Sequence, residues 1–160
     1  MSVSFRIAEP FEYKELSSLR QKVWATTYRG IYPDDIIDNF DYAFHNEKDL
    51  FRITCDEFTV YFIEEENEKI GYLILQEKDI LYVQSLYLLK EHRGKGIGKL
   101  AFEKIRGFCK EKGYKRFYLG CHPQNEKALG FYLKMGGVIT YRDEGHENNR
   151  ENNVRIDFKV

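Results

Sequence analysis

The stretch Leu86–Lys99, LYLLKEHRGKGIGK, contains the change from one periodicity to another that decides the fold. Before it, Ile80–Leu89 is a continuous apolar run rich in β-forming residues. After it, apolar residues recur at helical spacing, at Ile97, Leu100, Ala101, Ile105 and Phe108. Glycine within a helix costs ~1 kcal/mol relative to alanine, so the glycines that open this helix need a reason. The pattern predicts a strand, a tight glycine turn and a long amphipathic helix.

The glycine turn has the composition of an anion-binding site. The first N–H groups of a helix have no partner within it, and glycines let a bulky anion approach them. Two familiar phosphate loops do not fit, because Leu100 stands where a Walker loop needs Ser or Thr, and Gly98 falls one residue early for a dinucleotide fingerprint. The alternative is a tight turn without a ligand. Positive charge near the turn comes from Arg93, Lys95 and Lys99.

Outward from this stretch, the sequence alternates strand and helix signals without repeats or linkers. We expect one α+β (α/β) domain over residues 1–160, with a mixed, mostly antiparallel sheet flanked by about four helices. One helix opens at Pro10 and runs to about Trp24, a second runs from Asp34 toward Leu50, a third ends at Gly113, and a fourth runs from Asn125 to Gly136–Gly137. The predicted strands are Ser2–Ala8, Phe58–Glu64, Lys69–Gln76, Ile80–Leu89, Arg116–Cys121, Val138–Tyr141 and Val154–Val160.

The composition excludes several classes of protein. Aromatic residues make up 16% of the 160 residues, enough to build a core and to exclude intrinsic disorder. The three cysteines, Cys55, Cys109 and Cys121, are widely spaced, which disfavours a disulfide scaffold or a zinc module and indicates a reducing compartment. The four histidines show no metal-ligand spacing, so no metal site is expected. We see no signal peptide and no membrane-spanning run, so a cytoplasmic protein is expected.

Charge is distributed unevenly along the chain. Residues 1–80 carry 9 basic and 17 acidic residues, a sum of −8, whereas residues 81–160 carry 16 and 9, a sum of +7. The segment Lys90–Arg116 alone holds ten bases. This segregation suggests an anionic ligand for one half and a cationic ligand for the other. Most of these bases lie on the outer side of one helix and the net charge is −1, so nucleic acid is not an expected partner.

A second motif follows the first at a characteristic distance. Arg93-x-x-Gly96-x-Gly98 between a strand and a long helix resembles the acyl-CoA pyrophosphate loop of the GNAT superfamily of N-acetyltransferases. The stretch from Asn125 to Gly136, NEKALGFYLKMG, resembles the Asn-x-x-Ala-x-x-Phe-Tyr-x-x-x-Gly helix of that family. The order of elements is also that of the family, so the resemblance covers nearly the whole chain. Gly137 departs from it, because the family has an aromatic residue after the glycine that ends the helix.

The resemblance implies acetyl-CoA as acetyl donor and assigns roles to residues of both motifs. The backbone of the strand segment Leu86, Tyr87 and Leu88 would bind the pantetheine arm, with Leu86 and Leu88 supplying the hydrogen bonds. Asn125 would hold the donor near the junction of pantetheine and phosphate, Lys134 would reach a phosphate, and Tyr132 would lie by the sulfur as general acid. The pyrophosphate would be held by Arg93, Gly94, Lys95, Gly96, Ile97 and Gly98, with Lys99 adding charge.

The reaction that the resemblance implies is acetyl transfer to a primary amine by direct attack in a ternary complex. An alkylammonium has a pKa of about 10.4, so the site must help the amine to lose a proton. Many relatives carry a Glu on the strand before the glycine turn, but Leu81–Leu86 has no carboxylate. Candidate bases are Asp34, Asp35, Asp38 and Glu77, and each is also explained as a surface charge. Cys121 is expected to be a buried apolar residue rather than a nucleophile.

The acceptor is a small-molecule or peptide amine by the same reasoning. The family's acceptor pocket corresponds here to Trp24–Asp38 and Asp143–Asn153, with Tyr28 and Tyr32 as substrate-binding residues. Aromatic rings beside acidic residues suit a cationic amine, and the first segment resembles bacterial relatives that include polyamine acetyltransferases. A protein N-terminus or an amino sugar is an open alternative, a homodimer is compatible with the sequence, and a non-catalytic acyl-CoA-binding or sensor module is the alternative function.

Overall fold

A computed structural model describes residues 2–160, so that the first residue of the predicted domain lies outside it. Seven strands form one sheet in the order β1-β2-β3-β4-β5-β7-β6. Their bounds are β1 Val3–Ile7, β2 Phe58–Glu65, β3 Glu68–Gln76, β4 Leu81–Leu88, β5 Arg116–Cys121, β6 Val138–Asp143 and β7 Asn153–Lys159. Only β4 and β5 pair in parallel, and every other pair is antiparallel. The predicted mixed, mostly antiparallel sheet is confirmed.

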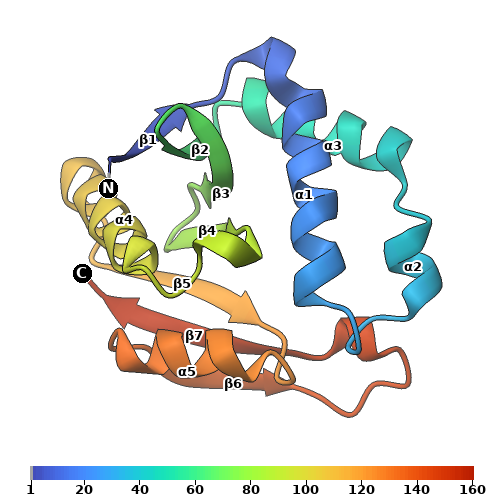
Figure 1. Ribbon diagram of the computed structural model, residues 1–160. Coiled ribbons are helices and arrows are strands. Elements are labelled where there is room, and N and C mark those ends of the chain that lie inside the picture. Colours follow the sequence, from blue (N-terminus) through green and yellow to red (C-terminus); the bar gives the residue numbers. More distant parts are fainter. Residues whose placement is uncertain (1) are drawn as a thin grey trace.

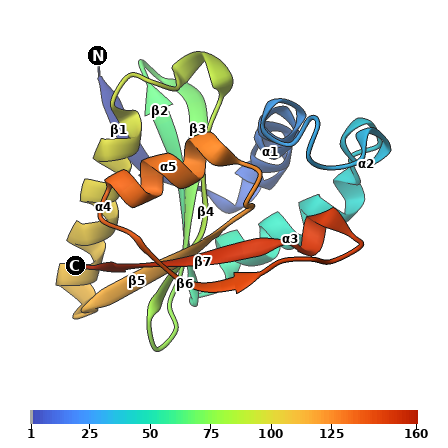
Figure 2. The same ribbon diagram turned by 90° about the horizontal axis from the view of Figure 1, so that it is seen from below.

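Helices cover both faces of the sheet (Figure 2). On one side lie α1 (Tyr13–Thr27), α2 (Asp34–Asp38) and α3 (Tyr42–Thr54), and on the other lie α4 (Ile97–Lys112) and α5 (Glu126–Lys134). The helix predicted from Asp34 toward Leu50 is wrong, because the chain forms two helices there. Asn39 leaves the helical conformation and ends α2, and the Asp41 side chain accepts from the Phe44 N–H and starts α3. Pro10 opens a short 3-10 turn, Pro10–Glu12, ahead of α1.

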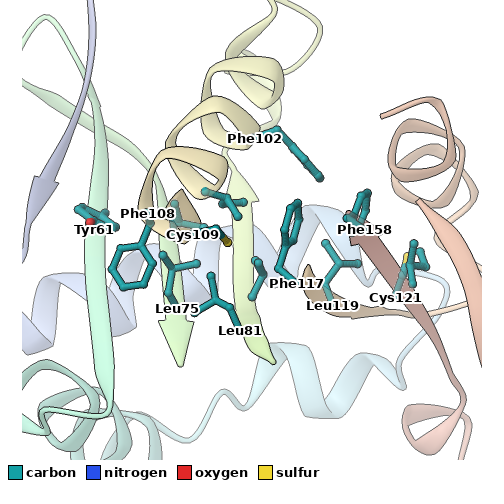
Figure 3. Close-up of a cluster of buried hydrophobic side chains, with 14 of the residues drawn as sticks. Tyr61, Leu75, Leu81, Phe102, Phe108, Cys109, Phe117, Leu119, Cys121 and Phe158 are labelled. Atoms are coloured by element: carbon teal, nitrogen blue, oxygen red, sulfur yellow. The ribbon is translucent and has the colours of Figure 1, made fainter. Parts of the chain in front are cut away.

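Core side chains on both faces of the sheet hold the helices that flank it, and Figure 1 shows α1 and α4 on opposite sides of the strands. Leu16, Leu19 and Val23 of α1 pack against β2 and β3, whereas the apolar stripe of α4 packs against β3, β4 and β5. The larger core is aromatic: Figure 3 shows Phe102, Phe117 and Phe158, and the last two stack with ring centroids 4.8 Å apart. α4 ends at Gly113, whose φ of +86° explains why glycine stands there.

A buried ion cluster joins α1 to α3. The carboxylate of Asp49, fully buried, accepts from Ser17 at 2.8 Å, from Arg20 at 2.7 Å and from Arg52 at 2.9 Å. The Arg20 guanidinium lies 5.1 Å from the centroid of the Tyr72 ring. Because α1 also carries Tyr28 toward β4, this cluster fixes the position of the helix that lines one side of the site.

We expect Asp49→Asn to lower the free energy of unfolding by about 3–5 kcal/mol, because the buried Arg20 guanidinium and the partly buried Arg52 guanidinium then lose their common anion. Chemical denaturation followed by circular dichroism measures this. Asp56→Asn, at an exposed position after α3, is the matched control and should change stability by less than about 0.5 kcal/mol. A D49N protein as stable as the control would show that the cluster does not hold the helices.

Candidate active site

The site is built where β4 and β5 separate. The two strands pair only over Leu81–Val83 and Phe117–Leu119. Beyond that point Gln84 forms a bulge in β4, since Leu75 is opposite Val83 and Ile74 is opposite Ser85. The second half of β4 stays paired with β3, and β5 pairs with β7 along its full length. The sheet therefore opens between two adjacent strands while both remain fixed on their outer edges.

The opened edge of β4 presents backbone groups of Leu86 and Leu88. The Leu89 N–H donates to the Ile70 carbonyl at 2.8 Å, so Leu89 bonds toward β3. Residues of an antiparallel strand alternate in the direction of their backbone groups, so Tyr87 also bonds toward β3, and Leu86 and Leu88 face the opening. A pantetheine arm that binds like a strand requires this orientation of the backbone groups. The Tyr87 side chain points to the α1 face of the sheet, where it packs against Tyr72.

The glycine turn after β4 fits a diphosphate. Gly94 and Gly96 have φ values of +76° and +83°, and a Cβ built at either would meet open space. Ile97 is 1% exposed and packs with Ile63 and Ile70, which anchors the start of α4. Within residues 2–160, the backbone N–H groups from Lys95 to Lys99 have no hydrogen-bond acceptor. Free N–H groups at the N-terminus of a sixteen-residue helix bind anions through hydrogen bonds and the helix dipole.

The Arg93 guanidinium forms hydrogen bonds within the protein. Its Nε donates to the Leu88 carbonyl at 3.0 Å and its Nη2 to the Thr27 hydroxyl at 2.8 Å. The side chain therefore ties the glycine turn to β4 and to the end of α1, and only its backbone lies along the turn. Lys95 and Lys99 are exposed beside the open N–H groups. Their direct contact with a phosphate, like that of the Arg93 backbone, stays a prediction.

The second motif forms α5, which packs against the start of α4. A Cβ at Gly98 would lie 2.7 Å from the Phe131 ring, so the absence of a side chain there lets the two helices meet. Asn125 precedes α5, and its side chain makes no hydrogen bond to another described residue. Lys134 is exposed at the end of the helix. The roles predicted for Asn125 and Lys134 stay predictions.

Tyr132, on α5, packs on Phe102 and Phe131 and lies close enough to Tyr87 of β4 and Cys121 of β5 for both to affect its pKa. Its hydroxyl has no hydrogen-bond partner among residues 2–160, and the ring is half-buried. Burial, with smaller effects from Tyr87 and Cys121, raises the pKa of Tyr132 well above its ordinary value. Burial likewise raises the pKa of the Cys121 thiol to about 11. These surroundings therefore favour a neutral phenol at Tyr132 and disfavour a thiolate at Cys121.

On the α1 face, a wall of aromatic rings leads away from Tyr87. The Tyr28 and Tyr87 hydroxyl oxygens are 2.7 Å apart, and Tyr28 stacks on Tyr32 with centroids separated by 4.1 Å. Burial raises the pKa of Tyr28, and burial also raises the pKa of Tyr87 to about 12. Both phenols are therefore neutral near pH 7, so they can orient an amine by hydrogen bonds but cannot act as its general base.

The two segments predicted to form the acceptor pocket do meet. The Asn149 amide nitrogen donates to the Ile31 carbonyl at 2.7 Å, and the Asn149 carbonyl oxygen is 2.8 Å from the His122 Nε2. Asn149 belongs to the 3-10 turn η3 (Asn149–Glu151) between β6 and β7. The sequence did not point to Asn149, His122 or the Tyr87 hydroxyl, because their partners lie far away along the chain.

The acidic residues considered as bases do not reach these hydroxyl groups. Asp34 and Asp38 are exposed and form ion pairs with Arg29 at 3.2 and 2.9 Å. Glu77 precedes β4, at the end of the strand opposite the glycine turn. Among the described residues, no carboxylate forms a hydrogen bond with Tyr28, Tyr87 or Tyr132. The strand before the turn carries Gln84 at its bulge in place of an acid.

Residues 17–137 match the family model described as the acetyltransferase (GNAT) family. The chain belongs to the GNAT acetyltransferase family. It is 27% identical over 152 residues to spermidine N(1)-acetyltransferase of Thermoplasma acidophilum, a match covering 89% of this chain and 92% of that one. It is also 26% identical to the Escherichia coli peptidyl-lysine N-acetyltransferase YjaB, over 61% of each chain.

Solved structures share the GNAT fold over the full length. The PaiA N-acetyltransferase from Thermoplasma acidophilum in complex with coenzyme A superposes with a TM-score of 0.85 at 23% identity, covering 100% of both chains. The GNAT protein described here is an acetyl-CoA-dependent N-acetyltransferase, and the open glycine turn and the separated strands suit that donor. No helix among residues 2–160 is both long and apolar enough to span a membrane.

Proposed function

We propose that this GNAT protein transfers the acetyl group of acetyl-CoA to a primary amine by direct attack in a ternary complex, with Tyr132 as the general acid. The observation that carries the proposal is the position of Tyr132, whose hydroxyl is neutral, has no partner among residues 2–160, and lies near Tyr87 of β4 and Cys121 of β5, the two strands that separate. The opening connects the glycine turn on the α4 side with the tyrosines on the α1 side, so donor and acceptor can meet within it.

The residues of the candidate active site have separate tasks in this scheme. When bound, acetyl-CoA supplies the acetyl group as a thioester, and the chain's own residues bind it and provide a proton. The N–H groups of Lys95–Lys99 and the strand backbone of Leu86 and Leu88 hold it. Tyr28 and Tyr87 orient the amine, and the proton of the amine leaves to water because no carboxylate adjoins these hydroxyl groups.

The energetics of proton donation by Tyr132 depend on its surroundings. A phenol with a pKa of about 10 is a weak donor to a thiolate whose conjugate acid has a pKa near 8.5, a mismatch of roughly 2 kcal/mol. Burial raises the pKa of Tyr132, which increases the mismatch, but the pKa of the neighbouring Cys121 thiol is raised by the same burial. A thiolate held there is therefore also a stronger base than in water, which offsets part of the mismatch, and the proton has to be donated as the carbon–sulfur bond breaks.

For the acceptor we propose an amine that carries positive charge, as spermidine does. The aromatic wall formed by Tyr28, Tyr32 and Trp24 supports this through cation–π attraction, and so does the name of the Thermoplasma relative. The name of the Escherichia coli relative indicates that this relative acts on a peptide lysine. A peptide lysine presents the same ammonium group on a longer scaffold.

A panel of amines tests the proposal. Thiol release from acetyl-CoA is measured with spermidine, 1,4-diaminobutane, butylamine, a lysine-containing peptide and glucosamine. We expect the diamine and spermidine to give the highest kcat/KM, with the rate rising with pH as the free amine becomes available. Binding of acetyl-CoA without thiol release for any amine would contradict the proposal and favour a non-catalytic acyl-CoA sensor.

A further inference from the structure

A hollow of about 460 Å³ lies beyond the aromatic wall, where the end of α1 meets α2 and the start of α3. Trp24, Phe40 and His45 form its inner side, and their rings are in mutual contact: Trp24 meets Phe40 at 5.3 Å and His45 at 5.1 Å between centroids. Trp24 also contacts Tyr28 and Tyr32, at 6.0 and 5.8 Å. The wall therefore continues without interruption from the Tyr28–Tyr87 hydroxyl pair to the hollow.

Arg150 places a cation on this wall. Its guanidinium carbon lies 5.3 Å from the centroid of Tyr32 and 5.9 Å from that of Trp24. Among residues 2–160, Arg150 is the one arginine whose guanidinium forms neither an ion pair nor a hydrogen bond. The guanidinium thus lies against aromatic rings instead of in an ion pair, and Arg150 is exposed to solvent.

The backbone that carries Arg150 is fixed although its side chain is not. The Arg150 N–H donates to the Asn148 side chain at 3.1 Å. The neighbouring Asn149 is held by Ile31 and His122, as described above, and by the Gln124 side chain at 2.8 Å. The guanidinium can therefore leave the wall by rotation of its side chain, without loss of a backbone hydrogen bond.

The charges around the hollow favour a cation. Asp35 and Asp41 line it and pair with no basic side chain of the described residues, whereas Asp34 and Asp38 are both held by Arg29. Burial and the nearby Arg20 lower the pKa of His45 to about 4, so the imidazole is a neutral wall residue near pH 7. On the outer rim, Lys48 lies over the ring of Phe44.

We propose that Arg150 is a built-in cation occupying the aromatic face where the second ammonium group of a diamine or polyamine acceptor binds, and that it thereby sets the selectivity between singly and doubly charged amines. This inference rests on the proposed function for the identity of the acceptor. Two cations cannot share the same faces of Trp24 and Tyr32, so the second ammonium must displace the guanidinium. Removal of Arg150 should then strengthen the binding of a diamine and leave that of a monoamine unchanged.

Trp24 is the only tryptophan of the sequence, so its fluorescence reports directly on this wall. The protein is saturated with coenzyme A, which carries no acetyl group, and is titrated with 1,4-diaminobutane, 1,6-diaminohexane or butylamine. We expect Arg150→Gln to lower the Kd of at least one diamine about three- to tenfold and to leave the Kd of butylamine within twofold. Arg150→Lys, which keeps a cation, should stay close to the wild-type protein. Arg142→Gln removes an exposed arginine that pairs with Glu144 and serves as the matched control.

Several outcomes would overturn the inference. Weaker binding of the diamines by R150Q would show that Arg150 contributes to the site rather than competes for it. Equal changes in the Kd values of the diamines and of butylamine would show a general effect on the fold. Circular dichroism of R150Q checks the fold independently. A Trp24 signal that answers to no amine in any variant would exclude the subsite. Diamine binding that follows the expected pattern in a protein without acetyl transfer would contradict the proposed function alone.

Discussion

Tyr132→Phe is expected to lower kcat about 100-fold while the affinity for acetyl-CoA stays within about threefold of the wild-type value. The substitution removes the hydroxyl, which lies near Tyr87 of β4 and Cys121 of β5, and keeps the ring that packs on Phe102 at 6.1 Å and on Phe131 at 5.9 Å. Turnover is measured by thiol release and acetyl-CoA binding by calorimetry, so that loss of proton donation is separated from loss of the donor.

The pH dependence sharpens this prediction. Burial raises the pKa of Tyr132, so the phenol keeps its proton throughout the range in which an alkylamine loses its own. The wild-type rate of thiol release should therefore rise with pH and show no decline below a pH of about 10. Tyr141→Phe, on the exposed side of β6, is the control and should leave kcat unchanged. A Y132F turnover within twofold of the wild-type value would exclude the general-acid role.

Gly96→Leu is expected to weaken acetyl-CoA binding at least about tenfold. A side chain at Gly96 meets no protein atom within 4 Å, so it would project into the open space beside the free N–H groups. A diphosphate held by those groups would then collide with it and lose charge-assisted hydrogen bonds. Calorimetric titration with acetyl-CoA measures the change.

The opposite end of the same helix supplies the control. Gly113 has a φ of +86°, close to the +83° of Gly96, and its surroundings are equally open. Gly113→Leu therefore imposes a similar backbone strain on α4 at a position far along the helix from the glycine turn. Equal losses of acetyl-CoA affinity in G96L and G113L would mean that strain in α4, and not the blocked turn, is responsible.

Local signals predicted most of the fold. The apolar spacing from Ile97 to Phe108 and the glycine at 113 placed α4 within the bounds that the structure gives. The predicted strands Phe58–Glu64 and Lys69–Gln76 are confirmed as β2 and β3, which pair as a hairpin with Glu66 and Asn67 both at positive φ in the turn. The second helix was mispredicted because apolar residues continue at helical spacing through Ile37 and Phe40. The break depends on Asn39 and the Asp41 cap, a polar detail that periodicity does not register.

The site could be predicted only where its residues lie close together in sequence. The glycine turn and the α5 motif are local patterns, and both are placed at the opening of the sheet. The contacts that complete the acceptor side join distant segments: Tyr28 meets Tyr87, and Asn149 meets Ile31. Arg93 shows the same limit, since its motif places it in the glycine turn but does not indicate that its guanidinium bonds to Thr27. Side-chain direction depends on packing between elements, which a single sequence does not contain.

The glycine turn before α4 is expected to bind the diphosphate of acetyl-CoA. Calorimetric titration of the wild-type protein with acetyl-CoA and, separately, with acetyl-pantetheine tests it most directly, because the two differ by the nucleotide part that contains the diphosphate. We predict saturable binding of acetyl-CoA and an affinity for acetyl-pantetheine at least about 100-fold weaker. Equal affinities, or no saturation by acetyl-CoA at millimolar concentration, would contradict the account.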